Sequence, residues 1–252
     1  GHITAEQAKS WDDGTPVDKV ISDKLGFDFN WYNVFTSKNA LMPEFETKVI
    51  KEFEDGTKHI LDRQGCVVLQ KPNAVSIPSE IDHTLKVRKS WKKHYLPRLQ
   101  FSEDRILKAK VNTGNEFLQF DKGGLEFLQN SERDNPIGIF IGSLFGVIRD
   151  WFGVIGVSYL VADDENLYDE IIETVANLCY KCAEFTLSKG AKFDFGHFWE
   201  DISFKNGPLV TPSVFNTKVG PYYKKITQLL KNYGIDIVSV DSDGKIDELI
   251  DT

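Results

Sequence analysis

The chain has 252 residues, of which 41% are hydrophobic, and its formal net charge at pH 7 is -8. This length and composition suffice for one large hydrophobic core, so we expect a single globular domain over residues 1–252. The acidic balance leaves no broad basic surface for phosphate backbones, which argues against nucleic acid as a partner.

The first part of the chain, residues 1–110, is interpreted as an N-terminal extension. Its start lacks the charged, apolar and small-residue zones of a signal peptide, so we expect a cytoplasmic protein. Residues 58–71 predict a hairpin of two short strands with a turn at Gln64 and Gly65. A polar helical region is expected over residues 81–106, interrupted at Pro97.

Residues 111–252 are interpreted as alternating strands and helices, a pattern typical of parallel sheets with crossover helices. Asp163 or Asp164 is expected to cap a helix that runs to Gly190, and Thr211 followed by Pro212 marks another helix start, with a second start or a kink at Pro221. The strands are predicted at residues 137–142, 192–199 and 235–240, and a new helix is predicted to begin at residues 246–250.

The most apolar stretch, residues 137–162, is long enough to raise the question of a membrane span. Arg149 and Asp150 lie near its middle, where charges are costly in lipid. We therefore predict a buried strand followed by a helix, and no membrane association.

The three cysteines, an odd number, argue against a disulfide framework and for a reducing compartment. Cys179 and Cys182 have the spacing of a redox or zinc motif, but they also lie on an apolar helical stripe with Ile171, Val175 and Phe185. We expect both thiols to pack in the core as small hydrophobic groups.

The repeated strand and helix pattern fits both an open doubly wound sheet and a (β/α)8 TIM barrel, and we favour the barrel. No glycine-rich nucleotide-binding motif follows a predicted strand. About five βα units can be counted, so we expect the barrel to be incomplete at its C-terminal end.

Carboxylates follow two of the predicted strands, at the edge where barrel enzymes place their sites. Glu200 and Asp201 are catalytic candidates, with solvated loop carboxylates as the alternative. Asp241 and Asp243 are two residues apart and can share a proton or bind a cation, unless Asp243 only caps the next helix. With His197 they are also the candidate ligands of a divalent metal.

Four further residues are candidates for substrate binding. Arg149 suits a substrate carboxylate, or else forms an internal ion pair with Asp150. Trp199 can stack on a flat substrate or simply pack at a strand end. His197 and Lys205 complete the set, with a core imidazole as the alternative for His197.

A resemblance covers residues from about 25 to the end. The segments HFWEDISFKNGP and VDSDGKIDEL, together with LMPEFETKVIKEFEDGTKHILDRQG and FIGSLFGVIRDWFG, resemble the uroporphyrinogen decarboxylase superfamily, in particular its methyltransferase-like branch. The resemblance implies a (β/α)8 barrel and a site at the carboxyl ends of its strands. It also implies methyl transfer with a partner corrinoid protein or action on a small acidic substrate. A homodimer is a candidate assembly.

Two alternatives to methyl transfer remain. The first is decarboxylation of uroporphyrinogen in porphyrin biosynthesis, although the arginine-rich motif R-Q-A-G-R of those enzymes is absent. The second is a catalytically inert binding subunit. In the methyltransferase branch a zinc ion held by His-x-Cys activates a thiol, and that motif falls near Asp241 and Asp243, which would instead offer hard oxygen ligands.

Overall fold

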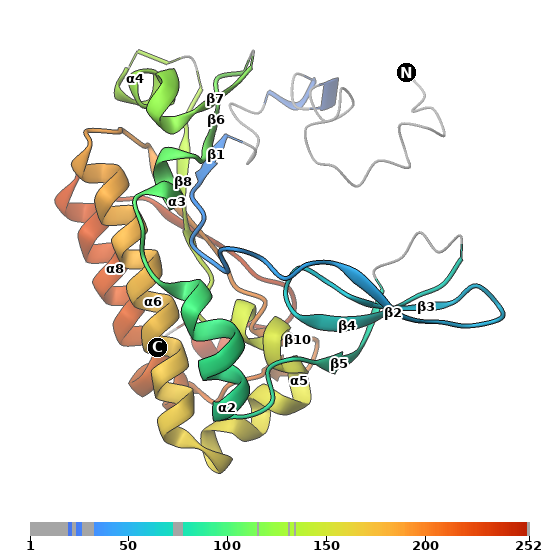
Figure 1. The fold of residues 1–252 in the computed structure, drawn as a ribbon. Helices are drawn as coiled ribbons and strands as arrows, with labels where there is room; N and C mark the ends of the chain where they lie inside the picture. The colour runs from blue at the N-terminus through green and yellow to red at the C-terminus, as the bar shows by residue number, and fades with distance from the viewer. Residues whose placement is uncertain are drawn as a thin grey trace.

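The computed structural model describes residues 20–21, 24–26, 33–72, 78–114, 116–130, 132–133 and 135–250 (Figure 1). It is a mixed α/β fold built around one parallel sheet. That sheet contains four strands in the order β1-β8-β9-β12, and all three pairings are parallel. The strands are β1 (Val34–Thr36), β8 (Gly138–Gly142), β9 (Phe195–Trp199) and β12 (Val238–Asp241).

The strands predicted at 137–142, 192–199 and 235–240 are confirmed as β8, β9 and β12, with shorter bounds in β9 and β12. The edge strand β1 was not predicted, and it lies inside the segment interpreted as an extension. The described residues thus form four parallel strands, where the sequence suggested about five βα units of a barrel.

Three long helices accompany the sheet: α5 (Gly146–Asp163), α6 (Glu165–Ser188) and α8 (Gly220–Asn232). Figure 1 shows α6 and α8 side by side along one face of the sheet. Asp164 caps α6 by accepting the N–H of Leu167 at 3.0 Å, which selects one of the two predicted caps. No helix in the described part of the chain is long and apolar enough to cross a membrane.

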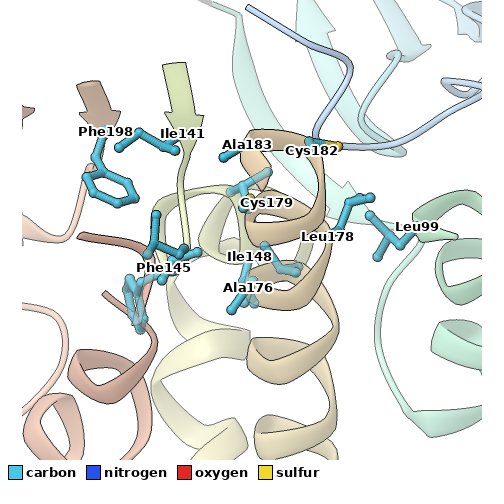
Figure 2. Close-up of a cluster of buried hydrophobic side chains, with 14 of the residues drawn as sticks. Leu99, Ile141, Phe145, Ile148, Ala176, Leu178, Cys179, Cys182, Ala183 and Phe198 are labelled. Atoms are coloured by element: carbon cyan, nitrogen blue, oxygen red, sulfur yellow. The ribbon is translucent and has the colours of Figure 1, made fainter. Parts of the chain in front are cut away.

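The core lies where α6 meets the sheet and the start of α5. Figure 2 shows Cys179 and Cys182 on α6 among apolar side chains that include Ile141 of β8 and Phe145. Both thiols are free and buried, as is Cys66, so the prediction of core packing is confirmed. Burying one such apolar side chain contributes about 1.5–3 kcal/mol for the larger residues, so this interface holds α6 firmly on the sheet.

A second sheet of four antiparallel strands extends to one side of the body (Figure 1). It contains β2 (Lys48–Glu52), β3 (Lys58–Leu61), β4 (Cys66–Gln70) and β5 (Ser79–His83), and we call it the arm sheet. The pairing of β3 with β4 confirms the hairpin predicted over 58–71. Strand β5 packs against α5 and brings the end of the arm sheet to the parallel sheet.

The polar helical region predicted over 81–106 is only partly correct. Its first residues belong to β5, and the helical part is broken into α2 (Arg88–Ser90), the π-helical turn η2 (Trp91–Tyr95), the 3₁₀ turn η3 (Leu96–Leu99) and α3 (Asp104–Leu107). Trp91 and Tyr95 are fully buried, so this segment contributes to the core rather than to a solvated surface.

The remaining elements are short and connect the larger ones. Thr211 caps the helix start at Pro212 as predicted, and the second start near Pro221 is the beginning of α8. The 3₁₀ turn η6 lies within the helix predicted at 246–250. These connecting elements are β6 (Lys110–Asn112), β7 (Phe117–Gln119), η4 (Phe120–Gly124), α4 (Leu125–Gln129), β10 (Ser203–Phe204), β11 (Gly207–Pro208), α7 (Pro212–Val214), η5 (Phe215–Val219) and η6 (Asp247–Leu249).

Candidate functional site

The candidate site lies at the carboxyl edge of the parallel sheet, where β8, β9 and β12 end. The chain leaves β8 into the start of α5, and it leaves β9 at Glu200 and Asp201. The backbone N–H of Glu200 donates to the carbonyl of Asp241 at 2.7 Å, which continues the pairing of β9 with β12 by one residue. Polar residues from three strand ends therefore meet at one edge.

Glu200 is buried and holds the start of α5. Its carboxylate accepts backbone N–H groups from Leu144, from Phe145 at 3.2 Å and from Gly146 at 2.8 Å. These are the unpaired donors at the positive end of the helix dipole, which a carboxylate stabilises. Burial raises the pKa of Glu200, while the neighbouring hydroxyl of Tyr223 and the three N–H groups oppose that rise. Because its oxygens are already engaged, Glu200 is suited to positioning α5 rather than to proton exchange.

Arg149, in the first turns of α5, joins two carboxylates. Its guanidinium pairs with Asp201, which follows β9, and with Asp150 at 3.1 Å. The side chain of Arg149 is only 15% exposed. The internal ion pair between Arg149 and Asp150 that the sequence suggested is confirmed. Since two carboxylates already neutralise this guanidinium, the geometry does not favour Arg149 as an anchor for an acidic substrate.

Asp150, at this edge, has a pKa that lies closer to neutral pH than that of an ordinary aspartate. Burial raises its pKa to about 6; Arg149 opposes the rise, and the carboxylates of Glu80, Asp201 and Asp62 add to it. Its side chain is nevertheless 26% exposed, so it remains in contact with solvent. A carboxyl group with a pKa near 6 can both accept and release a proton at physiological pH.

The arm sheet supplies the other wall of this cluster. The Cys66 thiol donates to the backbone carbonyl of Asp150 at 2.7 Å and lies 3.4 Å from Nδ1 of His83. Nε2 of His83 lies 3.8 Å from the Glu80 carboxylate. A helix kink at Gly153, with φ of +72°, lets the His83 ring rest on the backbone of α5. We call Cys66, Glu80, His83, Arg149, Asp150 and Asp201 the edge cluster.

His197 lies within the sheet instead of at its end. The imidazole is buried, and its Nδ1 is 2.8 Å from Oγ of Ser239 on the adjacent strand β12. Burial lowers the pKa of His197, and the charge of Asp241 opposes that effect. His197 is thus a largely neutral imidazole tied to its neighbouring strand.

The remaining predicted residues lie around the edge cluster and not in it. Trp199 is half-buried against the start of α5 at Gly146, and Asp241 is its register partner on β12. Asp243 is exposed in the turn after β12, and Lys205 is exposed in the turn between β10 and β11.

A metal site at Asp241, Asp243 and His197 finds no geometric support. Within the described residues, no group of three or more His, Cys, Asp or Glu side chains is arranged to hold a metal ion. The thiol-activating zinc implied by the resemblance therefore does not fit the residues that the structure places here, and no step of a reaction is assigned to a metal.

Two members of the edge cluster, Arg149 and Asp201, are among the candidates named from the sequence, whereas three other members are not. Cys66, Glu80 and His83 lie on strands of the arm sheet, far from α5 along the chain. Nothing in the local pattern of β5 distinguishes His83 from an ordinary strand residue. Asp150 was visible only as an ion-pair partner, because its raised pKa depends on burial and on carboxylates from distant segments.

Comparisons with known proteins give limited similarity. No protein-family model matches the chain, and a search of curated proteins finds no match. Among solved structures the chain is similar to a methyltransferase from Methanosarcina mazei, with 13% sequence identity and a TM-score of 0.42. The alignment covers 72% of this chain and 47% of that protein, so the chain spans about half the length of the protein it matches.

Proposed function

We propose that this chain is a methyltransferase-like enzyme of the uroporphyrinogen decarboxylase superfamily, with the architecture of a (β/α)8 barrel and with Asp150 as the proton-exchanging group. The proposal rests on the sequence resemblance and on the parallel sheet, whose carboxyl edge collects the charged residues. The observation that carries it is Asp150 itself, a partly exposed carboxyl group at that edge, paired with Arg149 at 3.1 Å and with a pKa of about 6.

The proposed reaction is transfer of a methyl group from a corrinoid carried by a partner protein to a small nucleophile that bears a proton. The nucleophile forms a bond to the methyl carbon as the bond from that carbon to the donor breaks, and the donor keeps the electron pair. The nucleophile's proton passes to the carboxylate of Asp150. Such general base catalysis typically contributes about 10²–10⁴-fold to the rate.

The other residues of the edge have positioning roles in this proposal. Arg149 holds Asp150 and Asp201 together, and Glu200 fixes the start of α5 from which Arg149 and Asp150 project. Arg149 is already paired with Asp150 and Asp201, so its positive charge is not available to a substrate carboxylate. The edge cluster therefore favours a neutral or weakly acidic nucleophile over a strongly acidic substrate.

Methylcobalamin and a panel of small thiols test the proposal, with loss of the methyl-cobalt absorbance as the readout. The wild-type protein should transfer the methyl group, and Asp150→Asn should lower the rate at pH 7 by about 10²-fold or more. Asp163→Asn, which changes an exposed carboxylate on the same helix, is the matched control.

No methyl transfer to any thiol by the wild-type protein, at any pH between 5 and 9, would refute the proposed activity. Release of carbon dioxide from uroporphyrinogen without a methyl donor would identify the decarboxylase alternative instead. Turnover that is equal in wild type and Asp150→Asn would remove Asp150 from the chemistry.

A further inference from the structure

We infer that a group of exposed lysines beside the edge cluster is the docking surface for an acidic patch on a partner protein. The group consists of Lys89 on α2 and of Lys92 and Lys93 on the π-helical turn η2, and we call it the lysine face. In the proposed function that partner is the protein that carries the corrinoid. The identity of the partner therefore rests on the proposed function, whereas the argument from charge does not.

The segment that carries the lysine face is strongly basic within an acidic chain. Residues 83–102 contain six Lys or Arg residues and no Asp or Glu, although the net charge of the whole chain is -8. Two cations of this segment are already engaged, because Lys86 pairs with Asp82 at 2.7 Å and Arg88 pairs with Asp164 at 2.8 Å. The three lysines of the face are exposed, and none of them forms an ion pair with a described residue. Their charges are therefore available to a partner.

Helical geometry places these lysines together on the solvent side of the segment. Trp91 and Tyr95 lie four residues apart and are fully buried, so they mark the side that faces the core. The first lysine of the face is followed by the other two at three and four positions, which groups all three on the opposite side. The local field is positive: burial lowers the pKa of His94, and the charges of Lys93 and Arg98 lower it further.

The lysine face is held rigidly next to α5. The indole N–H of Trp91 donates to the carboxylate of Glu170 on α6 at 2.9 Å. The ring centroid of Tyr95 lies 5.3 Å from that of Trp151, the residue that follows Asp150 on α5. Figure 1 shows α2 beside α6 at the end of the molecule where α5 lies. A partner bound to the lysine face would therefore lie beside the edge cluster, on a segment that the fold has already ordered.

The chemistry of the face favours an acidic protein over other anionic partners. Proteins bind nucleic acids with arginine groups and with exposed aromatic rings that stack on the bases. The lysine face has neither, because both aromatic side chains of η2 are buried. A membrane-binding helix exposes an apolar side to lipid, but here Trp91, Tyr95 and Leu99 are covered by the core. Separate ammonium groups on a solvent-exposed face match carboxylates spaced over a protein surface.

Fluorescence anisotropy with a labelled oligoglutamate peptide tests this surface without methyl transfer. The wild-type protein should bind the peptide at low salt and release it as the salt concentration rises. Lys92→Glu with Lys93→Glu should weaken binding by about tenfold or more. Lys224→Glu with Lys225→Glu makes the same change in net charge at exposed lysines of α8, so it is the matched control and should bind as the wild type does. Circular dichroism establishes that each variant is folded.

Two kinds of result would overturn the inference. The first is no binding of the peptide at low salt, or equal weakening by the two double variants. The second is tighter binding of a DNA duplex or of phosphatidylserine vesicles through the same lysines, which would replace the acidic protein by another class of partner.

Cross-linking locates the bound peptide without any substitution. A carbodiimide couples carboxylates to lysine amines that are in direct contact with them. Mass spectrometry should find the peptide attached at Lys89, Lys92 or Lys93. Attachment spread equally over these lysines and those of α8 would overturn the inference.

The docking surface and the proposed function fail separately. Transfer from free methylcobalamin needs no partner protein, so Lys92→Glu with Lys93→Glu should retain the wild-type rate in that assay. A protein that binds the peptide through the lysine face but transfers no methyl group would refute only the function. A protein that transfers methyl groups but does not bind the peptide would refute only the docking surface.

Discussion

Replacing Asp150 by asparagine should change how the stability of the fold depends on pH. The substitution keeps the size of the side chain and removes its charge. Burial raises the pKa of Asp150 from 3.8 to about 6, so the folded protein binds this proton more tightly than the unfolded chain does. The stabilisation from the protonated group is complete below pH 3.8 and is lost as the pH rises through about 6.

The magnitude follows from the two pKa values. A tenfold change in proton affinity corresponds to about 1.4 kcal/mol, so the change from 3.8 to about 6 corresponds to about 3 kcal/mol. Because the side chain is partly exposed, this is an upper figure. Relative to wild type, Asp150→Asn should therefore gain up to about 3 kcal/mol of unfolding free energy between pH 4 and pH 8.

Urea unfolding followed by tryptophan fluorescence at several pH values measures this difference. Subtracting the two proteins removes the contribution of the other titrating groups. Asp163→Asn, an exposed carboxylate on α5, is the control. A stability difference between wild type and Asp150→Asn that is the same at pH 4 and pH 8 would refute the burial argument for Asp150.

Three further predictions test the structure around the edge cluster. Glu200→Gln should lower the free energy of unfolding by about 1–3 kcal/mol in urea titrations, because the amide group would face N–H donors of α5; unchanged stability would contradict this role. Gly153→Ala should lower the thermal midpoint, since the new methyl group would overlap His83 at a φ of +72° and such strain costs about 1–3 kcal/mol. Gly156→Ala in the same helix should lower it less, because Gly156 does not have a positive φ and the new methyl group would meet only the Phe152 side chain, at 3.3 Å. Burial raises the pKa of the Cys66 thiol, so the native protein should not react with Ellman's reagent at pH 8 although the urea-unfolded protein does.

The sequence was most informative where local signals are strong. The apolar runs, interpreted as buried strands, predicted β8 and β9, and Asp164 and Gly190 marked the ends of α6 within two residues. The apolar stripe through Cys179 and Cys182 was sufficient to predict core packing, because a helix face requires only residues close in sequence.

The failures have a common physical cause. Strand β1 has only three residues, which is too few for an alternating pattern to be recognised. The helical region around Trp91 was predicted as polar because its lysines dominate the local composition. The structure instead buries Trp91 and Tyr95, which flank two of these lysines. The role of Glu200 as a cap for α5 depends on a helix 54 to 56 residues earlier, which the sequence around Glu200 does not reveal.

The edge cluster shows the same limit. Besides burial, the pKa of Asp150 depends on charged groups that are distant in sequence, including Asp201 on the loop after β9 and Glu80 on the arm sheet. Asp241 and Asp243 suggested a site because they lie two residues apart in the sequence. Two other carboxyl groups at this edge have a pKa raised by burial: Glu200, and Asp150, which is paired with Arg149 next to it in the chain. Tertiary burial, and not spacing in the sequence, raises the pKa of Asp150.

The pH dependence of methyl transfer tests the central claim most directly. If Asp150 accepts the proton of the nucleophile, kcat/KM with methylcobalamin and a fixed thiol should rise with pH through about 6 and then level off. Asp150→Asn should lose that rise together with most of the rate, while Asp163→Asn should retain both. A rise near pH 6 that persists in Asp150→Asn would contradict the assignment of Asp150 as the proton acceptor.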